Sequence, residues 1–107
     1  MEIVVALGFV GIDPTTGGGG SPTVWVEDEE EEIIVQSQTA DAALCEKIAG
    51  TEWVPGHAVG IPAHESVIRI PARMVPILKE AIERVERARL RRTAEERSAE
   101  RRTPGDA

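Results

Sequence analysis

The sequence predicts a small α+β protein, with a mainly antiparallel sheet of three or four strands and two helices packed on one face of that sheet. Near the N-terminus, short β-branched runs alternate with polar connections, which is typical of an antiparallel meander. Two later segments repeat apolar residues at helical spacing. The 107 residues, 41% of them hydrophobic, suffice for one core. We expect the order β-β-β-α-β-α in a single domain over residues 1–90, followed by a charged, disordered tail over residues 91–107.

The first three strands are expected in the N-terminal third. Residues 3–12 are apolar and β-branched nearly throughout, interrupted by Gly8 and Gly11, which indicates a central strand that is either covered on both faces or bent where another backbone segment approaches closely. A glycine-rich connection, residues 13–22, leads to a second strand over residues 23–27. The acidic turn at residues 28–31 then returns the chain into a third strand over residues 32–38.

The first helix is expected over residues 40–49. Thr39 precedes it as a candidate N-cap, and Gly50 follows it as a candidate left-handed terminator. A long loop over residues 51–65 comes next, and Trp53 is expected to fill the edge of the core from this loop.

The last strand and the main helix form the densest apolar segment of the chain. The strand is expected over residues 67–70, and the helix is expected to begin at Pro76, because proline is favoured at the first helical position. This pattern places Ile82 in the core and ends near residue 90. The predicted buried face consists of Ile77, Leu78, Ala81, Ile82 and Val85.

Charge is distributed unevenly along the chain, whose formal net charge is −7. Residues 1–72 carry about −10 and residues 73–107 about +3. An acidic chain disfavours direct binding of nucleic acid, because phosphate affinity comes from cationic side chains that release counterions. Only the basic C-terminal segment has a charge that would favour binding to nucleic acid.

Residue patterns also bear on the compartment. Glu2 stands where a signal peptide carries positive charge, and no apolar run approaches the roughly 18 residues of a membrane span. The single Cys45 excludes an internal disulfide, which fits a reducing compartment. We expect a soluble, cytoplasmic protein that does not bind a membrane.

The sequence contains no motif that specifies catalysis. The glycines at residues 17–20 lead into a strand without the lysine of a phosphate-binding loop, so a flexible connection is the better interpretation. His57 and His64 form the weaker hypothesis of a zinc site, because their spacing matches no standard ligand pattern. We therefore predict no enzymatic activity, no cofactor and no metal.

Asp13 supports one alternative function. The motif Gly11-Ile12-Asp13-Pro14 at the end of a first strand resembles the opening of RNase H-like nucleases, including the Holliday-junction resolvases. The resemblance implies that Asp13 would be the first metal-binding carboxylate. The strand at residues 67–70 ends without the further acid that two-metal chemistry needs. An Asp-Pro turn is thus the favoured interpretation, and a minimal or degenerate metal-dependent nuclease using Asp13 is the alternative function.

The acidic run at the predicted hairpin is the most unusual local feature. Adjacent carboxylates repel one another unless solvent screens them or a cationic partner lies opposite. One interpretation is a solvated turn that discourages edge-to-edge aggregation. The other is a docking site for an arginine-rich partner, either another protein or the chain's own tail, with Arg73 exposed in the turn before the main helix. The candidate partner-binding residues are Glu27, Asp28, Glu29, Glu30, Glu31, Glu32 and Arg73.

Four segments follow one another in the chain: Gly11-Ile12-Asp13-Pro14, the glycine-rich connection, Ser21-Pro22-Thr23-Val24-Trp25 and the stretch over residues 65–76. In this order they resemble a group of short actinobacterial proteins of unknown function. The resemblance implies a gene beside an Xre-type helix-turn-helix regulator, and hence a partner or antitoxin-like role. We therefore expect a non-enzymatic regulatory module that binds a protein, with a helix-turn-helix regulator as the candidate partner.

Overall fold

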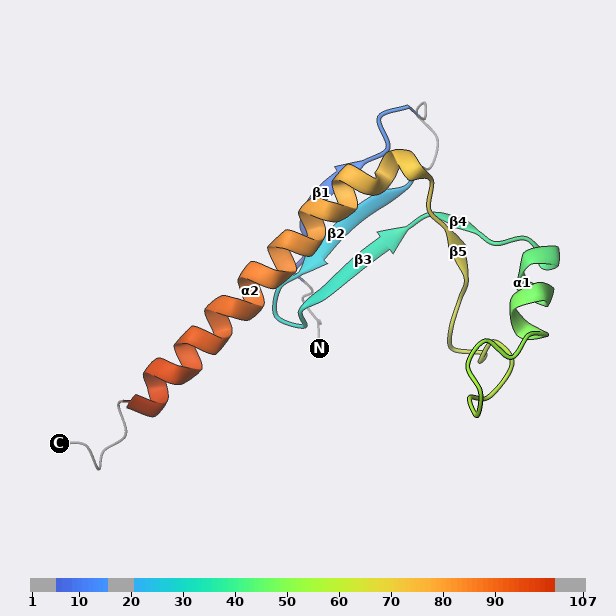
Figure 1. The fold of residues 1–107 in the computed structure, drawn as a ribbon. Coiled ribbons are helices and arrows are strands. Elements are labelled where there is room, and N and C mark those ends of the chain that lie inside the picture. Colours follow the sequence, from blue (N-terminus) through green and yellow to red (C-terminus); the bar gives the residue numbers. More distant parts are fainter. Residues whose placement is uncertain (1–5, 16–20, 102–107) are drawn as a thin grey trace, which may run out of the picture. The chain divides into compact units, whose positions relative to one another are not determined.

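The computed structural model describes residues 6–15 and 21–101. The glycine-rich connection at residues 16–20, and the start of the first expected strand, lie outside the described residues. The α+β fold class is confirmed (Figure 1).

Contacts within the chain divide it into two units. The first, here called the sheet-helix unit, comprises Met1–Gln36 and Ala72–Ala107. The second, here called the loop unit, comprises Ser37–Pro71. The division falls inside the range that the sequence assigns to one domain, residues 1–90, and whether the two units fold together stays a prediction.

The sheet of the first unit is the expected three-stranded meander. Its strands are β1 (Gly8–Ile12), β2 (Thr23–Glu27) and β3 (Glu32–Gln36), paired antiparallel in the order β1-β2-β3. The sequence interpretation that made the first strand central is wrong, since among the described strands β2 is central and β1 lies at an edge. At Gly11 a Cβ would lie 3.0 Å from the Ile77 side chain, so glycine permits the main helix to approach β1 closely, in line with the expected close approach at this residue.

The main helix α2 (Val75–Arg101) follows the short 3₁₀ helix η1 (Ala72–Met74) and packs on one face of this sheet (Figure 1). It begins one residue before Pro76, close to the expected start. The buried core joins β2 to η1 and α2 and consists of Val24, Val26, Met74 and Ala81. Val10, Ile33, Val35, Ile77, Leu78 and Val85 pack around it.

The sequence placed Ile82 in the core, and this was wrong, because Ile82 is 47% exposed. The buried line of the helix runs through Met74 and Ala81, seven residues apart, and Ile82 lies about 100° around the helix from Ala81. The methionine that opens the line lies in η1, just before the helical pattern of α2 begins.

Helix α2 continues to Arg101, although the apolar pattern ends near residue 90. Residues 91–101, expected as part of a disordered tail, are helical, and residues 102–107 lie outside the described residues. The segment is rich in arginine, glutamate and alanine, which have high helix propensity. Helix formation therefore extends beyond the part that the sheet covers. Neither described helix combines the length and the apolar content needed to cross a membrane.

The loop unit contains a second, two-stranded sheet and one helix. Strand β4 (Gln38–Thr39) pairs antiparallel with β5 (Ile68–Arg69), so the fourth expected strand does not join the meander. Helix α1 (Ala42–Ala49) lies between them in the chain.

Three details of the loop unit differ from expectation. Asp41, not Thr39, caps α1, and its Oδ1 accepts a hydrogen bond from the Leu44 amide at 2.9 Å. Gly50 ends the helix with φ of −91°, which is not left-handed. Trp53 does not fill a core, since it is 62% exposed and donates from Nε1 to the Ile48 carbonyl at 3.0 Å.

Candidate partner-binding site at the acidic hairpin

The acidic run forms the hairpin between β2 and β3. Glu27 and Glu32 face each other across the two strands as the last pair of the ladder. The residues between them form the turn, closed by a hydrogen bond from the Glu31 amide to the Asp28 carbonyl at 3.3 Å. Glu31 has φ of +55°, a left-handed conformation that costs a non-glycine residue about 1 kcal/mol. The hairpin thus keeps a glutamate where glycine would be less strained.

An arginine from α2 binds this turn. Arg92 Nη2 donates to the Glu29 carbonyl at 2.8 Å and approaches the Asp28 carbonyl at 3.4 Å, while Nη1 lies 3.1 Å from Glu31 Oε1. The Arg92 and Glu31 side chains are 45% and 27% exposed, so this ion pair is partly shielded from water. The turn therefore has the geometry to hold a guanidinium group through both carbonyl and carboxylate oxygens.

Sequence reasoning included the chain's own tail as a partner for the acidic run but did not single out Arg92. The seven-residue spacing of side chains along the helix was sufficient to identify it. Leu78, Val85 and Arg92 follow one another at seven-residue intervals, which keeps all three on the side of the helix that faces the sheet. Arg92 is the residue of this line that lies beside the turn between β2 and β3, at the end of the sheet.

The other carboxylates of the hairpin remain available. Asp28, Glu29 and Glu30 are exposed, and within the described residues none of the three side chains forms an ion pair. Glu27 and Glu32 likewise form no ion pair with any described residue. One arginine thus neutralises only part of a group of six acids.

Arg73 is not at the hairpin. It lies on η1, at the opposite end of β2, where its Nε donates to Asp13 Oδ2 at 2.6 Å. Its side chain remains 45% exposed, in line with the expected exposure. The structure therefore does not bring Arg73 together with the six acidic candidates, and its role in binding stays a prediction.

Asp13 is held by its own neighbours. It is buried, and its Oδ1 accepts hydrogen bonds from the backbone amide and the hydroxyl of Thr15, both at 2.9 Å. Desolvation raises the pKa of Asp13, but hydrogen bonds from Thr15 and Arg73 and the positive charge of Arg73 outweigh it and hold the pKa below its ordinary value. These contacts form the Asp-Pro turn that the sequence favoured, with an arginine added to it.

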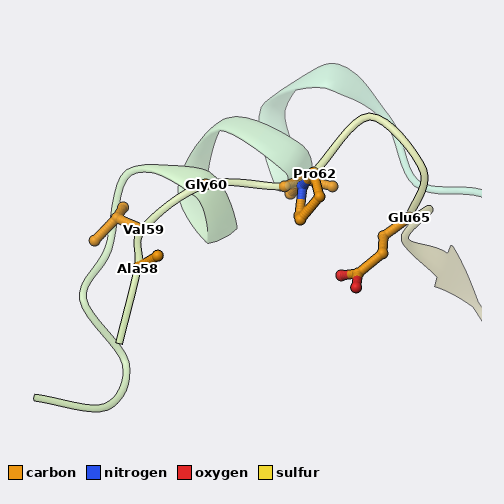
Figure 2. Close-up of a pocket in the computed structure, with 6 residues that line it drawn as sticks. Ala58, Val59, Gly60, Pro62 and Glu65 are labelled. Carbon is orange, nitrogen blue, oxygen red and sulfur yellow. The ribbon is translucent and has the colours of Figure 1, made fainter. Parts of the chain in front are cut away.

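The described residues contain no group of three or more histidine, cysteine and acidic side chains arranged to hold a metal ion. In the loop unit, His64 Nε2 lies 3.7 Å from Glu65 Oε2, and both side chains are largely exposed. Figure 2 shows a depression in the same loop, lined by residues 58–62 and Glu65. Glu65 is the one charged side chain among these lining residues, so they do not assemble a recognisable catalytic group.

Comparison of the chain with protein-family models, with curated proteins and with solved structures finds no match. The candidate site therefore rests on the geometry of the hairpin.

Proposed function

We propose that this protein is a non-enzymatic regulatory module that binds a cationic surface of a protein partner through its acidic hairpin. The sequence resemblance suggests a helix-turn-helix regulator as the candidate partner. The DNA-reading face of such a protein is basic, so it would complement the acidic hairpin. The hairpin acts by electrostatic attraction and by offering carbonyl and carboxylate oxygens to guanidinium groups.

The observation that supports this proposal is the contact between Arg92 and the turn. It provides an intramolecular example of arginine recognition, with a donor at 2.8 Å from the Glu29 carbonyl and another at 3.1 Å from the Glu31 carboxylate. The remaining carboxylates are exposed beside it. Asp13, by contrast, is already engaged by Arg73 and Thr15, and no observation favours the nuclease alternative.

A charge substitution in the turn tests the proposal. In the variant Asp28→Asn with Glu29→Gln and Glu30→Gln, three exposed charges are removed while the side-chain sizes and the Glu31–Arg92 pair are kept. We expect slower association with the candidate helix-turn-helix regulator, and a flatter dependence of the rate on salt, measured by stopped-flow fluorescence or surface plasmon resonance.

The matched control removes the same charge elsewhere. Glu95→Gln, Glu96→Gln and Glu100→Gln neutralise three exposed acids on the distal part of α2, so an effect of net charge alone would appear equally in both variants. Equal rates for the two triple variants, or no binding of the regulator at low salt, would contradict the proposal.

A further inference from the structure

The two faces of the three-stranded sheet differ in what covers them. Helix α2 covers the face that carries Val24 and Val26. Side chains alternate between faces along a strand, so Trp25 lies on the other face, here called the open face. The register places Phe9 and Ile34 on either side of Trp25. The open face therefore carries a row of three large apolar side chains across all three strands.

This row is partly accessible to water. Phe9 is 56% exposed, and Trp25 and Ile34 are partly exposed. Ile12, which the register places on the same face, is 49% exposed. Among the described elements, α2 packs on the sheet, and it does so from the other side. Neighbouring apolar side chains in such a row are a feature of interaction surfaces.

Two carboxylates border the row. Glu27 and Glu32 are directly opposed across β2 and β3, and the pleat places both on the open face, next to Trp25 and Ile34. Like charges directly opposite each other destabilise a sheet. A cation placed between them would relieve this repulsion and add an attraction.

We infer that the open face binds an amphipathic segment of a partner protein, with apolar side chains on the Phe9–Trp25–Ile34 row and arginine or lysine on the Glu27–Glu32 pair. This inference rests on the proposed function and specifies the partner's chemistry. The apolar row and the acidic border select a cationic amphipathic segment, since neither a purely charged peptide nor an anionic surface complements both.

Fluorescence of Trp25 tests the inference directly. The chain has two tryptophans, so Trp53→Phe leaves Trp25 as the sole reporter within the row. The probe is a synthetic helical peptide of about 15 residues with leucines along one side and arginines flanking them. We expect its binding to shift Trp25 emission to shorter wavelength and to reduce quenching by acrylamide. A peptide with serine in place of leucine, and one with glutamate in place of arginine, are the controls.

Substitutions in the chain separate the open face from other exposed apolar positions. Phe9→Ser should weaken peptide binding about tenfold or more, because it removes a large apolar contact. Ile82→Ser alters an isoleucine of similar exposure on α2 and should leave binding unchanged. If Phe9→Ser loses its cooperative unfolding transition, Ile12→Ser replaces it as the open-face variant.

Neutralising the Glu27–Glu32 pair should affect protein stability and peptide binding in opposite directions. Glu27→Gln with Glu32→Gln should raise the denaturation midpoint of the protein, because it removes the repulsion, and should weaken binding of the arginine peptide severalfold. A merely structural role for the pair would not give both results.

The outcomes distinguish this inference from the proposed function. Salt-dependent binding that needs the turn acids, but is equal for the leucine and serine peptides and leaves Trp25 unchanged, would overturn the inference and keep the proposed function. No salt-dependent binding of either arginine peptide would overturn both. A concentration-dependent shift of Trp25 emission without peptide, with a dimer in sedimentation, would show that a second copy occupies the face and would overturn the inference.

Discussion

The two ends of the sheet-helix unit use the same pair of chemical groups in different ways. At one end, Arg73 binds Asp13, a buried carboxylate that Thr15 also holds through two hydrogen bonds. At the other end, Arg92 binds a turn through two carbonyls and a partly exposed carboxylate. The first end has one acid whose hydrogen bonds fix its position, whereas the second has more acids than its arginine can neutralise. The contact between Arg73 and Asp13 therefore stabilises the fold, whereas the contact between Arg92 and the turn leaves carboxylates that a partner can bind.

A buried core joins the two ends. Met74 is fully buried there, so Met74→Ala should lower the free energy of unfolding by about 2–5 kcal/mol. Ile82→Ala, on the exposed side of α2, should cost less than about 1 kcal/mol. Urea denaturation of the two variants measures this difference. Equal losses would mean that the core is not where Met74 and Ala81 place it.

The buried end should show a characteristic pH dependence. The folded-state pKa of Asp13 lies below its unfolded value, so the ionised carboxylate contributes stability that is present above about pH 4 and is lost as the pH falls through the folded pKa. Asp13→Asn should therefore destabilise the protein clearly at pH 7.

As the pH falls through the folded-state pKa of Asp13, the stability difference between Asp13→Asn and the natural sequence should narrow, as shown by denaturant midpoints across the acid range. The matched substitution at the other end is Glu31→Gln. It should change stability less at pH 7, because its ion pair is more exposed. A larger effect of Glu31→Gln than of Asp13→Asn would reverse the assignment of the two ends.

A small stability effect is also expected at Arg92. Arg92→Met keeps the aliphatic length of the side chain and removes the guanidinium, and partly exposed ion pairs of this kind contribute about 0–1 kcal/mol. Thermal unfolding should therefore shift by only a few degrees. A loss of several kcal/mol would assign the hairpin contact a structural role like that of Arg73.

Much of this unit could be predicted from the sequence. Alternating β-branched runs predicted the meander, and the acidic run marked the hairpin, because both depend on local patterns. The position of β2 at the centre could not be read from apolar content alone, since residues 3–12 are equally apolar. Ile82 was placed in the core wrongly, because a wide stripe of apolar residues on a helix does not show which of them face the sheet.

The candidate site was predicted in part. The six acids are contiguous in sequence, so their shared location required no tertiary information. The contact of Arg92 with the turn joins residues more than sixty positions apart, and that of Arg73 with Asp13 likewise depends on how η1 meets β1. Such pairings follow from packing. Only the seven-residue spacing to Val85 pointed to Arg92.

The central claim is that the acidic hairpin, and not the Asp13 end, has free capacity for cations. The direct test is a titration of the isotopically labelled full chain with a short arginine peptide at low salt, followed by amide chemical shifts in two-dimensional NMR. We predict shifts concentrated at residues 27–32 that diminish with added salt, with the amides of Asp13 and Thr15 unchanged. Shifts spread equally over the hairpin and the distal acids Glu95, Glu96 and Glu100, or no shifts at the hairpin, would contradict the account.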